Sequence, residues 1–176
     1  MGLRPSVRLR LPGAENARRR VVQNRQRTRR IDTVLLKRIA TTLLRDLLDD
    51  EEAELGIHLV ESEEMATVNE IYLGHEGSTD VITFNHNTPD APESSKQPAL
   101  YGELFICVDD AMKFARDFGT TWQSEIARYV VHGVLHLRGY DDLEPALRRT
   151  MKREENRLMR RLANHYSLEA LAKPSA

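Results

Sequence analysis

The sequence predicts one domain of the α+β class, a mixed α/β arrangement in which about four strands form a mixed sheet and about five helices surround it. Short apolar or alternating runs typical of strands recur along the chain, and longer segments repeat apolar residues at helical spacing. A chain of 176 residues can bury its own core without disulfides. One helix is also expected to end in a metal site.

The strands are predicted from short segments bounded by polar or turn-forming residues. The first, with two adjacent valines, is expected at an edge of the sheet. The last is the most apolar and is therefore expected in the interior. The four segments are residues 20–26, 56–61, 80–84 and 101–108.

The helices are predicted from apolar repeats that follow capping residues. Asp32, Asp109 and Thr121 are expected N-caps, and Ser62 is expected to cap the second helix. Gly119 is expected to end the third helix. The predicted helices cover residues 33–48, 62–72, 110–118, 122–138 and 144–164.

The domain is expected to span residues 19–165 and to have irregular ends. Residues 1–18 show no periodicity and are predicted to be an irregular basic arm, and residues 166–176 an irregular tail. Residues 85–100, with three prolines and two adjacent serines, are predicted to form a long polar loop.

Charge is balanced overall but unevenly distributed. Lys and Arg total 26 and Asp and Glu total 27, giving a formal net charge of −1. Residues 1–30 carry many arginines against a single acid, Glu15, and residues 49–54 are mostly acidic. Such a basic block often contacts nucleic acid, although a solvated arm has the same composition.

Cysteine content and hydropathy predict the compartment. The lone cysteine, Cys107, excludes an internal disulfide and suits a reducing environment. No apolar run approaches membrane-spanning length, and the N-terminus lacks the apolar core of a secretory signal. We therefore expect a cytoplasmic protein with no membrane partner.

The segment Tyr129–Asp142 has the pattern of a metal site. His132 and His136 are four residues apart, so a helix places both imidazoles on one face. Gly139 can take the backbone angles that end the helix, which lets Asp142 return as a third ligand. Three protein ligands with a fourth position open for water are typical of catalytic zinc, so we expect one zinc ion per chain.

The same helix predicts where the histidines point. They share a face with Glu125 and Arg128, whereas apolar residues occupy another face, so the imidazoles are expected to point away from the buried stripe. This stripe consists of Trp122, Ile126, Val130, Val134 and Leu137.

The ligand spacing also occurs in zinc peptidases with the signature H-E-x-x-H-x-x-G-x-x-H/D. Those enzymes use the glutamate after the first histidine as a general base. Gly133 occupies that position here and cannot accept a proton. The sequence therefore disfavours an ordinary zinc peptidase.

The segment His132–Asp142, H-G-V-L-H-L-R-G-Y-D-D, resembles the signature H-G-x-L-H-L-x-G-Y-D-H of the YbeY family, metal-dependent endoribonucleases that mature ribosomal RNA. Three more segments resemble family segments in the same order. They are Val68–Tyr72, Ser78–Phe84 and Gly102–Cys107. The resemblance covers about residues 20–162.

The resemblance implies a zinc-dependent endoribonuclease that cuts single-stranded ribosomal RNA, with the small ribosomal subunit as partner. It places Thr79 and Asp80 beside the active-site cleft, and Glu103 is a candidate hydrogen-bond partner for a histidine N–H. The other candidates for the cleft or its surroundings are Asn69, Arg138 and Asp141, the last as an alternative metal ligand.

Two positions depart from the family pattern. Asp142 stands where a third histidine is usual, and two histidines with an aspartate are a chemically sound zinc set. Leu73 stands where the family has an arginine held to be important for cleavage. Apart from metal-bound water, no catalytic group is assigned. His75, Arg138 or the N-terminal arginines are candidate replacements for the cation that stabilises phosphoryl charge.

Leu73 motivates a second hypothesis from a different class of function. In it, the chain is a metal-stabilised RNA-binding or ribosome-assembly factor with weak or no nuclease activity. Cleavage of single-stranded RNA by the wild-type chain, compared with a Leu73→Arg variant, discriminates between the two hypotheses.

Overall fold

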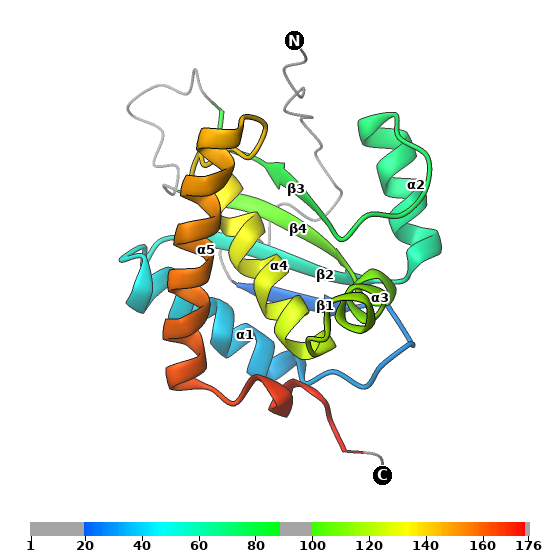
Figure 1. Ribbon diagram of the computed structural model, residues 1–176, viewed down its shortest axis with the longest axis horizontal. Coiled ribbons are helices and arrows are strands. Elements are labelled where there is room, and N and C mark those ends of the chain that lie inside the picture. Colours follow the sequence, from blue (N-terminus) through cyan, green and yellow to red (C-terminus); the bar gives the residue numbers. More distant parts are fainter. Residues whose placement is uncertain (1–19, 89–99, 175–176) are drawn as a thin grey trace.

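The computed structural model describes residues 20–88 and 100–174; the predicted arm of residues 1–18 and most of the predicted polar loop lie outside these ranges. The strands are β1 (Val21–Asn24), β2 (Glu54–Val60), β3 (Val81–Asn85) and β4 (Tyr101–Cys107). They form one sheet in the order β1-β2-β4-β3 (Figure 1). β1 pairs with β2 and β2 with β4 in parallel, whereas β3 is antiparallel to β4. The sheet is therefore mixed, as predicted, with the most apolar strand in its interior.

All five predicted helices are present, with bounds shifted by a few residues. The last part of the first one is π-helical rather than α-helical. The elements are α1 (Thr33–Thr41) with the π-helical η2 (Thr42–Leu47), α2 (Ser62–Leu73), α3 (Val108–Phe118), α4 (Trp122–Leu137), α5 (Pro145–His165) and the 3-10 helix η3 (Leu168–Leu171). No helix in the described parts of the chain is long and apolar enough to cross a membrane. The α+β class is confirmed.

The sheet separates two hydrophobic cores of different size. From β4, Leu104 and Ile106 join the larger core, to which α1, α3, α4 and α5 contribute. In Figure 1 α1, α4 and α5 lie in front of the sheet. Phe105 and Cys107 join the smaller core, to which α2 contributes Met65. The alternation of side chains along β4 thus supplies both cores.

Two glycines let α4 lie close against β4. A Cβ atom on Gly133 would come within 2.5 Å of Leu104 Cδ2, and one on Gly102 within 2.6 Å of Leu137 Cδ2. Real Cβ atoms do not approach so closely. A Cβ on Gly102 would also lie 2.6 Å from the Phe84 backbone carbonyl oxygen, so that position requires glycine, whereas a Cβ on Gly133 would displace the Leu104 side chain. Gly133 therefore faces the sheet, and its place in the histidine motif is explained by packing.

Two of the four expected caps form as predicted. The Asp32 carboxylate accepts a hydrogen bond from the Leu35 N–H at 2.9 Å, and the Thr121 hydroxyl accepts one from the Ser124 N–H at 3.2 Å. These caps begin α1 and α4 and satisfy backbone donors that have no partner within the helix.

The predictions for Ser62 and Asp109 are wrong. The N-cap residues of α2 and α3 are Glu61 and Cys107. Asp109 lies in the first turn of α3, where its carboxylate accepts hydrogen bonds from the Ser62 N–H and the Thr28 hydroxyl, each at 2.7 Å. Asp109 thus caps the neighbouring helix α2, a role that depends on tertiary structure.

The sequence suggested an irregular tail from residue 166, but part of this segment is a 3-10 helix that packs on the domain. Leu168 and Leu171 in η3 are buried in the larger core. Ala172 forms a β-bridge with Ile31, and the Lys173 N–H donates to the Arg30 carbonyl at 2.9 Å. Two buried leucines separated by one turn are enough to attach this segment to the domain.

Candidate metal centre

Helix α4 carries two histidines one turn apart near its C-terminal end. The rings of His132 and His136 meet edge to face, with centroids 4.6 Å apart and an interplanar angle of 81°. Their Nε2 atoms lie 3.1 Å apart. Both side chains are about three-quarters buried, with exposed fractions of 26% and 23%.

The surroundings of α4 are more buried than its sequence suggested. The predicted stripe lies in the larger core, with Trp122 only partly buried. Glu125, which shares a face with the histidines, is nevertheless only 2% exposed and accepts a hydrogen bond from the Thr120 hydroxyl at 2.6 Å. Because α3 and α5 pack beside α4, the histidine face is partly covered, and His132 lines a cleft between these helices.

Each histidine uses its Nδ1 atom for a hydrogen bond that orients the ring. His132 Nδ1 lies 3.0 Å from Glu155 Oε2, and His136 Nδ1 lies 3.1 Å from the Tyr140 carbonyl oxygen. Both partners are acceptors, so each Nδ1 carries the proton and donates. This arrangement leaves the Nε2 atoms on the side facing Asp142, the orientation that metal-binding histidines adopt.

Asp142 completes the group through the turn that follows α4. Gly139 has a φ of 92°, a left-handed conformation that favours glycine, and the chain then returns toward the histidines. Asp142 Oδ2 lies 3.8 Å from Nε2 of both His132 and His136. The carboxylate of Asp141 instead accepts hydrogen bonds from the backbone N–H groups that follow it, at 2.7 and 3.0 Å. Asp142 is thus the carboxylate that faces the histidines.

The three side chains fit a metal ion. Their ligand atoms all lie within 4.8 Å of one another. Two ligands at zinc bond lengths in a tetrahedral site lie about 3.3 Å apart, close to the observed 3.1 and 3.8 Å. When both rings carry their proton on Nδ1, two nitrogen lone pairs and a carboxylate oxygen converge here, an arrangement that a cation stabilises.

Glu155 on α5 binds His132 on the side of the ring opposite Asp142. Its carboxylate accepts hydrogen bonds from Arg128 at 2.6 Å and Lys152 at 2.8 Å as well as from His132. Burial raises the pKa of Glu155, but these hydrogen bonds outweigh burial and hold the pKa at about 2. Glu155 was not among the site residues predicted from the sequence. Its signal is a glutamate on the apolar stripe of α5, between Met151 and Leu158.

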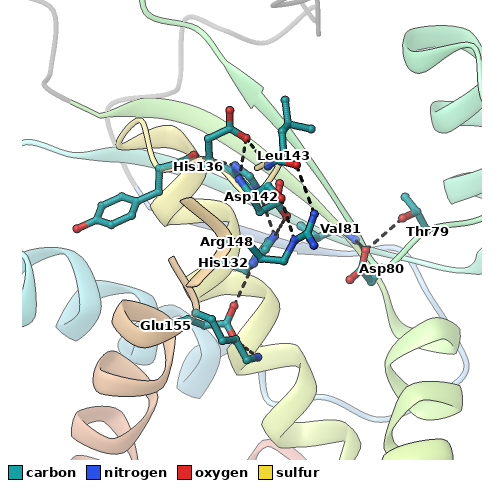
Figure 2. A network of polar contacts seen from close by, with 12 residues as sticks. Thr79, Asp80, Val81, His132, His136, Asp142, Leu143, Arg148 and Glu155 are labelled. Carbon is teal, nitrogen blue, oxygen red and sulfur yellow. Dashed lines mark hydrogen bonds and ion pairs between the residues drawn. The ribbon is translucent and has the colours of Figure 1, made fainter. Parts of the chain in front are cut away.

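The centre opens onto a cleft of about 490 Å³ between α3, α4 and α5. His132 and Asp142 line this cleft together with Glu155 and Arg148, and Figure 2 shows these four side chains gathered at one place. Asp80, at the start of β3, lines the same cleft. The metal-binding group is thus accessible from one side to a substrate.

Tyr129 also lines the cleft. Its hydroxyl is buried, and burial together with the negative charges of Asp80, Glu125 and Asp110 raises its pKa well above the usual value. A phenol with a raised pKa stays protonated at neutral pH. Tyr129 is therefore a potential hydrogen-bond donor and does not act as a base.

Comparison with known proteins now identifies the family. A family model described as Endoribonuclease YbeY matches residues 21–163, most of the chain. The chain belongs to the YbeY endoribonuclease family. This membership confirms the resemblance carried by His132–Asp142.

Individual relatives agree with this assignment. A protein from Thermobifida fusca named Endoribonuclease YbeY is 35% identical over 130 residues, which are 73% of this chain and 84% of the relative. One of the same name from Salinispora tropica is 33% identical over 136 residues, covering 73% of this chain and 87% of the relative. A solution structure of a Thermotoga maritima protein matches the fold with a TM-score of 0.59, at 23% identity over 83% of this chain and 90% of that one.

The residues expected beside the YbeY cleft are only partly brought together. Asp80 lines the cleft, and its Oδ1 accepts hydrogen bonds from the Thr79 hydroxyl at 3.1 Å and the Val81 N–H at 2.9 Å. Asn69 is buried in α2, where its amide donates to the Gly77 carbonyl at 2.8 Å. Asn69 therefore stabilises the loop before β3 and lies outside the residues that line the cleft.

Leu73 occupies the position where the resemblance implied an arginine. Its side chain is partly buried and packs against the smaller core, so this position supplies no positive charge. Of the candidate replacements, Arg138 pairs with the buried Asp50 at 3.8 Å and does not line the cleft. His75 follows the end of α2 and is exposed. The N-terminal arginines before residue 20 lie outside the described residues.

Arg148 on α5 is a cation that the sequence analysis missed. It is exposed, lines the cleft, and donates from Nε to the Asp142 carbonyl at 3.0 Å and from Nη2 to the Leu143 carbonyl at 3.4 Å (Figure 2). The guanidinium therefore lies beside the loop that carries Asp142. Sequence spacing gave no signal for it, since the contact depends on how α5 returns past the loop.

Glu103 does bind histidines, but not those of the metal centre. Its two carboxylate oxygens lie 2.8 Å from His58 Nε2 and 2.8 Å from His86 Nε2. Burial raises the pKa of Glu103, but hydrogen bonds from both histidines outweigh burial and lower the pKa to about 2. His58 stacks on Phe105, whose side chain belongs to the smaller core, so the cluster lies across the sheet from α4.

Proposed function

We propose that the chain is a zinc-dependent endonuclease for single-stranded RNA that acts in the cytoplasm in ribosomal RNA maturation and ribosome assembly, with the small ribosomal subunit as partner. The observation that supports this most directly is the convergence of His132, His136 and Asp142 at the edge of a cleft in a member of the YbeY family. One ion is expected per chain. Cys107 is a free thiol, which suits a reducing compartment.

The donor set supports zinc. Two imidazole nitrogens and one carboxylate oxygen form a typical three-ligand catalytic zinc site, in which the remaining position is open. The hydrogen bonds from His132 to Glu155 and from His136 to Tyr140 fix the ring orientations before an ion binds. Other first-row metals also bind imidazole, so the donor set favours zinc by chemistry and availability and not by affinity alone.

The chain's own residues would orient the substrate around the ion. Bound zinc would supply Lewis acidity toward the scissile phosphate group. Arg148, beside Asp142, would offer its guanidinium to the phosphoryl oxygens, where negative charge develops. Arg128 and Lys152 already bind Glu155, so their positive charge is partly neutralised and mainly holds that carboxylate in place.

Metal analysis and RNA cleavage test this proposal together. Purified protein is expected to hold one zinc ion per chain and to cut a single-stranded oligoribonucleotide in a chelator-sensitive way. His132→Ala is expected to lose both the ion and at least about 100-fold in rate, because even groups behind metal ligands contribute 10- to 100-fold. His165→Ala is the matched control, since His165 is exposed at the end of α5. Cleavage that survives both chelation and His132→Ala would contradict the proposal.

A second candidate function follows from Leu73, which packs against the smaller core where the family has arginine. The chain would then be a metal-stabilised RNA-binding or ribosome-assembly factor with weak or no nuclease activity. In the same assay, robust wild-type cleavage would reject this candidate. Weak wild-type cleavage that increases in Leu73→Arg would support it.

A further inference from the structure

Two phenylalanines on α3 are unusually exposed for large aromatic side chains. Phe114 and Phe118 are 39% and 66% exposed. They lie one helical turn apart, and their rings stack with centroids 4.2 Å apart and an interplanar angle of 25°. Isolated surface hydrophobic residues are common, whereas two aromatic rings stacked on each other at the surface place adjacent apolar area in water, which makes the pair a candidate binding surface.

The position of this pair connects it to the metal centre. Phe114 and Phe118 line the same cleft as His132 and Asp142. The cleft thus has aromatic side chains on α3, metal-binding residues after and within α4, and the cation Arg148 on α5. One occupant can therefore contact all three kinds of group.

We propose that Phe114 and Phe118 form a platform on which an unpaired RNA base next to the scissile phosphate stacks. The inference rests on the proposed RNA-cleaving function and assigns it a nucleotide-binding subsite. Unpaired bases in protein–RNA complexes commonly stack on aromatic side chains while phosphates contact cations. A phosphate at the metal centre and a base on the rings are parts of one nucleotide unit, which suits a single cleft of about 490 Å³.

The charges around the rings favour RNA over an apolar protein segment. Arg128, Arg148 and Lys152 line the cleft with the two phenylalanines, as do the carboxylates of Asp80, Glu125, Asp142 and Glu155. Arg128 and Lys152 bind Glu155, whereas Arg148 donates to backbone carbonyls, which leaves its positive charge available to a phosphate group. Binding of a protein helix or of a second copy of the chain would need a wide apolar surface. Two rings stacked on each other offer an apolar surface only about the size of one ring system. The occupant that matches a small π-surface beside positive charge is a nucleotide.

The platform would also give the cleft a preference for single-stranded RNA. A base within a duplex is covered on both faces by its neighbours and cannot stack on protein side chains unless it is extruded. Phe114 and Phe118 contribute no hydrogen-bonding groups, so they bind a base by its face and not by its edge. The platform would therefore select unpaired over paired RNA with little preference among sequences.

Equilibrium binding tests the platform separately from catalysis. Fluorescence anisotropy with a labelled single-stranded oligoadenylate, in chelator to stop cleavage, is measured for wild type and variants. Phe114→Ala combined with Phe118→Ala is expected to weaken binding about tenfold or more, and Phe118→Trp to preserve it. Ile71→Ala on α2 is the matched control, because Ile71 is also 66% exposed but does not line the cleft. Thermal unfolding shows whether each variant is folded.

A second measurement locates the stacked base. Oligonucleotides with one abasic position are scanned against wild type and the double alanine variant. One abasic position is expected to weaken wild-type binding about tenfold and to have little further effect on the variant, the non-additivity of two groups in contact. Alanine variants that bind within twofold of wild type, or abasic losses equal in both proteins, would overturn the platform.

The outcomes separate the platform from the nuclease activity. Loss of binding in the phenylalanine variants with no wild-type cleavage under any metal condition would support the platform and reject the nuclease. Normal chelator-sensitive cleavage with unchanged binding by the variants would reject the platform alone. A wild-type chain that binds no single-stranded RNA would reject the platform as well.

Discussion

Two clusters of similar composition lie on opposite faces of the sheet. Each contains two histidines and one glutamate whose pKa is held at about 2, with Glu155 buried and Glu103 partly buried. On the α4 face, Glu155 binds His132 through Nδ1. On the other face, Glu103 binds His58 and His86 through Nε2. The two clusters thus differ in which ring nitrogen the glutamate binds.

On the α4 face, the hydrogen bonds at Nδ1 leave the Nε2 atoms of His132 and His136 directed at each other and at Asp142. On the opposite face, the two oxygens of Glu103 take the Nε2 atoms, so those nitrogens do not converge on a shared point. That cluster joins β2, β4 and the segment after β3. The first cluster is thus arranged to hold an ion and the second to hold strands together.

Replacing each glutamate with glutamine tests whether the two clusters differ in their effect on zinc binding. Glu155→Gln is expected to weaken zinc binding about 10- to 100-fold, because the carboxylate behind a metal-binding histidine orients the ring and increases its basicity. Glu103→Gln is expected to leave zinc affinity unchanged. Chelator competition on the folded proteins measures both. Equal losses in the two variants would mean that the glutamates act only through stability.

The dependence of folding stability on pH should show whether the Glu103 carboxylate, bound to His58 and His86, stabilises the fold through its charge. Its pKa is lowered from 4.5 to about 2, so its contribution to folding is present above pH 4.5 and is lost as the pH falls toward 2. Glu103→Gln should therefore lower the free energy of unfolding by about 2 kcal/mol at neutral pH, a typical cost for a broken buried charged hydrogen bond. Urea unfolding at several pH values measures this difference. A deficit that stays constant down to pH 2 would show that the carboxylate charge is not responsible.

The fold was largely predictable because its signals are local. Apolar periodicity located the four strands and five helices, and Asp32 and Thr121 cap the helices that follow them. Asp109 was misassigned because its partner at Ser62 is distant in sequence. The end of η3 and the residue after it also depend on distant partners, because the Leu171 carbonyl accepts from the Asp32 N–H and Ala172 forms a bridge with Ile31. Local patterns predict elements, whereas contacts between elements need the structure.

The cluster that could hold a metal ion was predictable for the same reason, since His132, His136 and Asp142 lie within one helix and the turn after it. The residues around them come from other elements. Glu155 and Arg148 both lie on α5, and only the packing of α5 beside α4 brings them to the centre. Glu103 was expected to bind a histidine N–H, but the sequence could not show which one, because the partners lie on β2 and after β3.

The smallest expected effect concerns Arg148, the cation beside the metal-binding loop. Arg148→Gln is expected to lower kcat/KM for single-stranded RNA about tenfold, because a hydrogen bond to a charged group contributes about 1.5–3 kcal/mol and 1.4 kcal/mol is tenfold in rate. Arg149→Gln, one residue further along the exposed surface of α5, is the matched control. Zinc content decides between two explanations. If Arg148 contacts the phosphate, the variant keeps its zinc and Arg148→Lys recovers part of the rate. If Arg148 serves only to hold the loop through the carbonyls of Asp142 and Leu143, zinc affinity falls in both variants, and the cation that replaces the family's arginine must lie elsewhere.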